Sequence, residues 1–158
     1  MFHFFKKKEP IVINDTYGVF ALHKDRKCYE GTTVWLGKEM FVTLFCDSRE
    51  TLTAEKALEN FHKLMENAAD WDKRIREQSA RDMAGGGEMI EIWDEDENEE
   101  PLTVSKEEFT RRMSIGFVYL YPDGSIFFYY DLDNMFTDHG LGINADISGE
   151  LESPDLVG

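Results

Sequence analysis

Four short apolar runs fill the first 46 residues of the chain, and turn-forming residues separate them. The runs are rich in β-branched and aromatic residues, and the dividing segments read ND, KDRK and GKE. We expect three or four antiparallel strands, at IVI (11–13), YGVFALH (17–23), TTVWL (32–36) and MFVTLFC (40–46). In the last run both alternating sets contain apolar side chains, which indicates a strand covered on both faces.

A helical period of three- and four-residue steps begins after Thr53. Thr53 is suited to the N-cap, Leu52 can pack against Ala57 across it, and the glycines at 85–87 end the pattern. The spacing predicts one long helix whose core-facing stripe contains Ala54, Leu58, Phe61, Met65, Ala68 and Ile75.

A second, short helix is predicted from SKEEF, which has the form of a capping box with Ser105 and Glu108, and it ends near Met113. Two aromatic runs then flank YPDG, where Pro122 and Gly124 favour a hairpin turn. Both faces of this hairpin are apolar, so we place it centrally in a sheet that the run 140–147 completes.

These elements predict a fold of the α+β class: a mainly antiparallel sheet with one long and one short helix packed on it. The chain of 158 residues fits one such domain, at 11–158, preceded by an N-terminal arm at 1–10.

Charge narrows the classes of partner. The formal net charge is −15, and residues 94–158 contain three Lys or Arg against sixteen Asp or Glu. Because nucleic acids and anionic membranes are bound largely through basic side chains, we expect neither as a direct partner. A basic protein or a cation fits this surface, which also serves solubility.

The composition and the two cysteines indicate the cellular compartment that we expect for the protein. The chain is 42% hydrophobic and 31% charged, with no apolar run long enough to cross a bilayer, so we expect a soluble protein. Cys28 and Cys46 form no CxxC pair, which favours a reduced, cytoplasmic protein.

An acidic loop is predicted at 94–101, where Pro101 closes a block of like charges. Such a block is typically solvated, and it is also suited to a cationic partner. The acids concerned are Asp94, Glu95, Asp96, Glu97, Glu99 and Glu100.

The segment DLDNMFTDHG, at 131–140, is the other candidate site. Its oxygens and imidazole are ligand types for a divalent cation, supplied by Asp131, Asp133, Asp138 and His139. An EF-hand loop is excluded, because Phe136 and Gly142 occupy the positions that need Gly and Glu. The alternative is that these residues shape a turn and bind nothing. Common catalytic motifs are missing, and no cofactor is predicted.

Several segments resemble a bacterial family, the domain of unknown function 2262: ENFHKLMENAADWDKRIRE, LTVSKEEFTRRM, SIGFVYLYPDGSIFFYYDLDNMF and DHGLGINADISGELESPDLVG. The resemblance covers roughly residues 35–158, and FYYDLDNMFTDHGLGI is its most specific part. Members favour Gly-His where this chain has Asp138-His139, so no role resting on that glycine is carried over. The resemblance implies a fold and a cytoplasmic bacterial origin, and no catalytic residue.

Three hypotheses of function follow. The first is a non-enzymatic module whose acidic C-terminal half binds a protein, in its specific form an immunity-type inhibitor of a basic toxin. The second is a divalent-cation-binding or metal-assisted hydrolase domain that uses the segment 131–139. The third is a structural part with no dedicated site.

Overall fold

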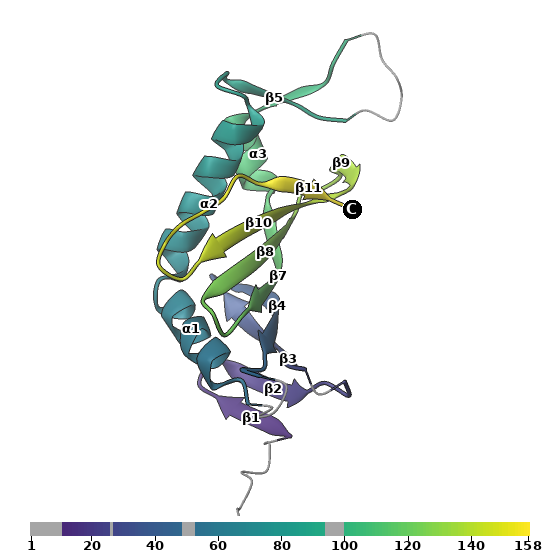
Figure 1. Ribbon diagram of the computed structural model, residues 1–158. Helices are drawn as coiled ribbons and strands as arrows, with labels where there is room; N and C mark the ends of the chain where they lie inside the picture. The colour runs from purple at the N-terminus through teal and green to yellow at the C-terminus, as the bar shows by residue number, and fades with distance from the viewer. Residues whose placement is uncertain (1–10, 26, 49–52, 94–99) are drawn as a thin grey trace, which may run out of the picture.

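The computed structural model describes residues 11–25, 27–48, 53–93 and 100–158. It has an eight-stranded sheet in the order β1-β2-β3-β4-β7-β8-β10-β11, a two-stranded sheet of β5 and β6, and three helices (Figure 1). The α+β class and the mainly antiparallel sheet are thus confirmed. The predicted arm 1–10 and the acidic residues 94–99 lie outside the described residues.

The N-terminal half of the sheet is the antiparallel meander that the apolar runs predict. Neighbouring strands pair in chain order, and the register of β3 with β4 runs from Cys28 opposite Phe45 to Trp35 opposite Lys38. The strands are β1 (Val12–Asp15), β2 (Gly18–Leu22), β3 (Cys28–Trp35) and β4 (Lys38–Phe45).

The predicted long helix is two helices, α1 (Glu55–Glu66) and α2 (Ala68–Met83), which Asn67 separates. The N-cap prediction was also wrong: Ala54 occupies that position and Thr53 donates to Asp47 Oδ2 at 3.1 Å. Asp47 instead serves as the acceptor for the helix, because its Oδ1 receives the Lys56 amide at 3.2 Å.

A small hairpin, β5 (Met89–Glu91) with β6 (Thr103–Ser105), leads directly into α3 (Lys106–Arg112). The Ser105 hydroxyl accepts the Glu108 amide at 3.1 Å, as the capping box predicts. The other half of the box is not formed, because the Glu108 carboxylate pairs with Arg111 at 2.6 Å.

The aromatic hairpin is central in the sheet, as predicted. It consists of β7 (Ser114–Leu120) and β8 (Ser125–Asp131), and Gly124 has a φ of +97° at its turn. β7 runs parallel to β4, which the antiparallel prediction did not contain. A parallel pair needs a long crossover, and here α1, α2, the small hairpin and α3 provide it. The chain ends with β9 (Met135–Asp138), β10 (Gly140–Asp146) and β11 (Asp155–Val157).

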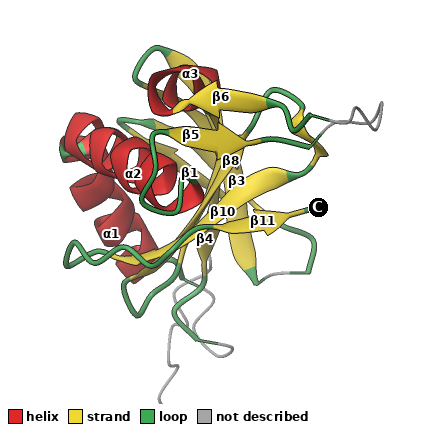
Figure 2. Ribbon diagram, turned by 90° about the horizontal axis from the view of Figure 1, so that it is seen from above, coloured by secondary structure: helices red, strands yellow, loops and turns green. Residues whose placement is uncertain are grey.

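Helices α1 and α2 cover one face of the sheet and enclose the core there (Figures 1 and 2). Trp71 of α2 lies 5.9 Å from the ring of Phe128, and Phe61 of α1 packs edge-on against Phe20 at 5.6 Å. No described helix is long and apolar enough to cross a membrane.

One polar network crosses this apolar layer at Asp72 of α2. Its Oδ1 accepts the hydroxyl of Tyr130 at 2.6 Å and the indole N–H of Trp35 at 3.4 Å. Its Oδ2 accepts Arg76 Nε at 2.8 Å, and Arg76 also donates to the carbonyl of Met113 at 2.7 Å. Burial and the nearby Asp72 raise the pKa of Tyr130, so this hydroxyl keeps its proton and donates. The network therefore joins α2 to the sheet and to the end of α3.

Candidate functional site

The face of the sheet opposite α1 and α2 bears a continuous group of aromatic rings, which we call the aromatic cluster. Phe117 stacks on Tyr129 at 4.8 Å between centroids and on Tyr119 at 5.0 Å, and Phe45 stacks on Tyr121 at 4.5 Å. Edge and tilted contacts connect these stacks. The members are Phe45, Phe117, Tyr119, Tyr121, Phe127 and Tyr129, and all six are half-buried.

Glycines beneath the rings let the rings lie close to the sheet. A Cβ atom at Gly140 would lie 2.2 Å from the Tyr129 ring, and one at Gly142 would lie 2.9 Å from the Phe127 ring. Gly116 also lies under Tyr129, at 3.0 Å. The rings therefore cover backbone that no side chain occupies, and they present their outer faces to solvent.

Other apolar side chains extend this surface. Phe41, which pairs in register with Phe117, is 61% exposed, Val34 is 63% exposed and Val19 is 57% exposed. Among the described residues no helix covers this face (Figure 1). Contiguous exposed apolar surface of this kind marks interaction sites on soluble proteins.

Charges divide unevenly between the two faces of the domain. In the described strands of the large sheet, Lys38 at the start of β4 is the only Lys or Arg. The described helices carry basic and acidic side chains together, whereas the charged strand residues on the cluster's face are acids. Strand alternation places on the cluster's face Glu30, Glu39, Asp131, Asp146 and Asp155.

The predicted segment 131–139 begins as a turn held by its own acids. Asp131 Oδ2 accepts the Asp133 amide at 3.0 Å, and Asp133 Oδ2 accepts Arg112 Nε at 2.8 Å. Asp133 and Asn134 have φ values of +50° and +59°, a conformation that Asn and Asp tolerate well. These carboxylates therefore have structural partners.

The other two predicted residues of this segment lie together at the end of β9. Asp138 is 94% exposed at its side chain, and its Oδ1 lies 3.3 Å from His139 Nδ1. The His139 ring packs edge-on against Trp93 at 5.0 Å, and Trp93 also packs edge-on against the buried Phe136 at 5.6 Å. The structure thus brings Asp138 and His139 together but gives Asp131 and Asp133 other partners. That the segment binds a cation stays a prediction.

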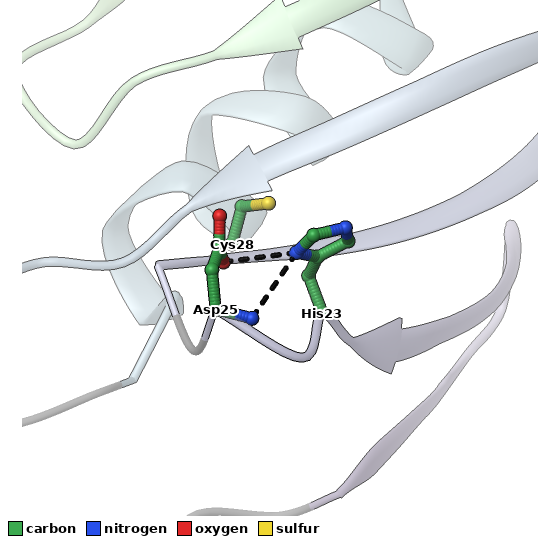
Figure 3. A group of neighbouring side chains, drawn as sticks. All are labelled: His23, Asp25 and Cys28. Atoms are coloured by element: carbon green, nitrogen blue, oxygen red, sulfur yellow. Dashed lines mark hydrogen bonds and ion pairs between the residues drawn. The ribbon is translucent and has the colours of Figure 1, made fainter.

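A different group of ligand-type side chains converges at the turn between β2 and β3 (Figure 3). One ligand atom each from His23, Asp25 and Cys28 lies within 4.8 Å of the other two. His23 Nδ1 is 3.0 Å from Asp25 Oδ1, and Glu30 Oε1 lies 3.9 Å from Cys28 Sγ. We call His23, Asp25 and Cys28 the turn triad.

Charges of both signs act on the turn triad: Glu30 and Asp25 act on Cys28, and Lys27 acts on Asp25. Burial raises the pKa of Cys28 to about 11, and Glu30 and Asp25 add to this effect. The backbone N–H of Lys27 lowers the pKa of Asp25, and His23 adds to that lowering. Asp25 is therefore a carboxylate near neutral pH, while Cys28 is a thiol, a state unsuited to a nucleophile.

The sequence analysis did not single out the turn triad. His23 and Cys28 are five positions apart in the sequence, but residue types alone do not give the geometry of the turn between them. The signal in the sequence was the segment HKDRKC, at 23–28, which contains a histidine, an aspartate and a cysteine between two predicted strands. All three are residue types that bind metal ions. The pairing of β2 with β3 is what brings the two ends of that turn together.

Comparisons with known proteins agree with the sequence resemblance. Neither the curated proteins nor the solved structures contain a match to this chain. A family model described as an uncharacterized protein conserved in bacteria, DUF2262, matches residues 14–156. The matched range begins before residue 35, where the sequence resemblance begins, and it includes all of the strands that carry the aromatic cluster. The chain therefore belongs to the DUF2262 family of bacterial proteins.

Proposed function

We propose that this protein is a non-enzymatic binding module whose aromatic cluster, with the acids around it, binds a basic protein. The observation that carries the proposal is the composition of one face. Half-buried rings share this face with five acidic strand residues. Lys38 is the single Lys or Arg of the described strands, and its Nζ donates to the Ser114 hydroxyl.

The rings would supply the affinity of such an interface. Aromatic side chains are enriched at the centres of protein interfaces, where they bury large areas at low cost in conformational entropy. Phe41 is 61% exposed and the six rings of the cluster are half-buried, so a partner would remove substantial apolar surface from water.

The acids would supply the selectivity. A net charge of −15 attracts basic proteins and repels nucleic acid and anionic membranes. Arginine suits this face in particular, because its guanidinium stacks on aromatic rings and binds carboxylates in a bidentate manner. We therefore expect arginine rather than lysine at the centre of the partner's surface.

The specific form of the proposal is an immunity-type protein that neutralises a basic toxin. Fast, charge-steered association suits an inhibitor that must reach its target before the target acts. In that form the acidic segment 94–100 contributes negative charge that speeds association.

Capture from a lysate of the source bacterium tests the proposal. The full chain would be compared with the double variant Phe41→Ser, Tyr119→Ser, at low and high salt. The matched control is Glu77→Gln, Asp82→Asn, which removes two exposed acids from α2 on the other side of the domain. A third variant replaces 94–100 with Ser and Gly.

We expect one basic protein to bind the wild type and the α2 control and to be lost from the cluster variant. Purified, that protein should bind the wild type in calorimetry, with an affinity that falls as salt rises. Replacement of 94–100 should slow association more than it speeds dissociation. A partner that the cluster variant retains, or one that binds equally well at high salt, would contradict the proposal.

A further inference from the structure

We propose that the turn triad is a binding site for a zinc-class divalent metal ion, with His23 Nδ1, Asp25 Oδ1 and Cys28 Sγ as ligands. The site lies at the border of the aromatic cluster, because Cys28 pairs in register with Phe45, and it shares no residue with the segment 131–139. A mixed set of one sulfur, one nitrogen and one oxygen favours zinc, cobalt or a similar ion over calcium or magnesium, which prefer oxygen alone.

The separations of the three ligand atoms fit one ion. Around tetrahedral zinc, neighbouring ligand atoms lie about 3.3 to 3.7 Å apart, given metal–ligand bonds of about 2.0 to 2.3 Å. Nδ1 and Oδ1 are already 3.0 Å apart, and all three atoms lie within 4.8 Å of one another. Small rotations of two side chains would therefore complete the geometry (Figure 3).

The contact between His23 Nδ1 and Asp25 Oδ1 needs a proton or a metal ion between the two atoms, and the Nδ1–H of a neutral imidazole can supply the proton. Nδ1 accepts the backbone N–H of Asp25 at 3.3 Å, yet it also faces the Asp25 carboxylate oxygen at 3.0 Å. A lone pair and a carboxylate oxygen at this distance repel one another unless a proton or a cation lies between them. A metal ion would satisfy both atoms and would also bind the nearby thiolate.

Glu30 is placed to orient the histidine. Its Oε1 lies 4.0 Å from His23 Nε2, the ring nitrogen that the proposed ion does not use. A carboxylate that accepts this N–H holds the ring of a metal-bound histidine and makes it a stronger ligand. The same carboxylate lies 3.9 Å from Cys28 Sγ, so it adds to the negative field that attracts a cation.

The exposure of the ligands suits an ion that enters from solvent. Cys28 is 6% exposed and forms the floor of the site, whereas the side chains of His23 and Asp25 are 33% and 46% exposed. The protein supplies three ligands, and this open side leaves a fourth position for water.

Titration of the full chain with cobalt chloride and zinc chloride tests the site. Thiolate bound to cobalt gives a charge-transfer absorption in the near ultraviolet, which reports Cys28 directly. We expect one equivalent of cobalt to produce this band and zinc to abolish it by displacement. Cys28→Ser should remove the band, and His23→Gln and Asp25→Asn should each weaken zinc binding at least about tenfold. Glu30→Gln should weaken it by about tenfold.

Two controls separate this site from other ligands of the chain. Cys46→Ser leaves the triad intact and should keep the cobalt band. His139→Gln removes a second His–Asp pair, Asp138 with His139, whose contact of 3.3 Å is similar but which has no cysteine, and this variant should also keep the band. Circular dichroism establishes that each variant is folded, and His23→Gln is at a partly exposed position where misfolding is not expected. No cobalt band in the wild type would overturn the proposal. So would zinc binding that survives Cys28→Ser and His23→Gln, or that is lost with His139→Gln.

Discussion

Removal of the Asp72 carboxylate should be among the most destabilising single changes in this domain. Asp72→Ala leaves the hydroxyl of Tyr130, which is 0% exposed, and the indole N–H of Trp35, which is 2% exposed, without their acceptor. It also removes the contact of 2.8 Å with Arg76. Buried donors that lose their partner cost about 1 to 3 kcal/mol each.

The structure sets the size of the effect and its coupling. The Trp35 contact is long, at 3.4 Å, so its loss falls at the low end of that range, and we expect about 3 to 5 kcal/mol in total for Asp72→Ala. Tyr130→Phe removes one donor to a charged acceptor and should cost about 2 kcal/mol. In the double variant no orphaned hydroxyl remains, so its cost should fall short of the sum by about 1 to 2 kcal/mol.

Equilibrium urea unfolding followed by circular dichroism measures these free energies. Asp72→Asn is the matched control, because its amide oxygen can still accept from Tyr130 while the ion pair with Arg76 is lost. It should lie between the wild type and Asp72→Ala. A cost below about 1 kcal/mol for Asp72→Ala, or strictly additive costs in the cycle, would refute the role of this network.

Three further predictions concern other parts of the fold. Gly140→Ala should destabilise the protein by about 1 to 3 kcal/mol, because the new Cβ would lie 2.2 Å from the Tyr129 ring, and Tyr129→Ala in the same chain should relieve most of that cost in thermal melts. Asp47→Ala should cost about 1 kcal/mol in urea unfolding through the lost acceptor at the start of α1. In a Cys46→Ser background, the rate of alkylation of Cys28 should rise about tenfold per pH unit up to about pH 11. A rate that already levels off near pH 9 would contradict the raised pKa of Cys28. Because the folded pKa is raised, the contribution of this thiol to stability is complete below about pH 9 and is lost as pH rises to about 11.

Local chemistry explains which parts of the fold could be predicted from the sequence. The turn YPDG and the cap at Ser105 depend on residues within a few positions of one another, and both form as expected. Asn67 interrupts a helix whose apolar spacing continues on both sides, so periodicity alone could not locate the break. The parallel pairing of β4 with β7 joins segments some 70 residues apart, and no local pattern encodes it.

The candidate sites follow the same rule. The aromatic residues of the hairpin were visible in the sequence, and the run 40–46 was expected to be covered on both faces because both of its faces are apolar. The structure covers one face of the sheet with α1 and α2 (Figure 1). No described helix covers the other face, where the rings of the aromatic cluster are half-buried. The reason is that rings lying over Gly116 and Gly140 shield one another and the backbone, so the sheet tolerates this face without a second layer.

Site-specific cross-linking in the source bacterium tests the central claim most directly. A photoreactive phenylalanine analogue at Phe41 lies beside the aromatic cluster, and the same analogue at Glu77 lies exposed on α2. The account predicts a cross-linked adduct with a basic, arginine-containing protein at position 41, and none with that protein at position 77. An adduct with that protein only at position 77, or an adduct at position 41 with an acidic protein or a second copy of this chain, would contradict it.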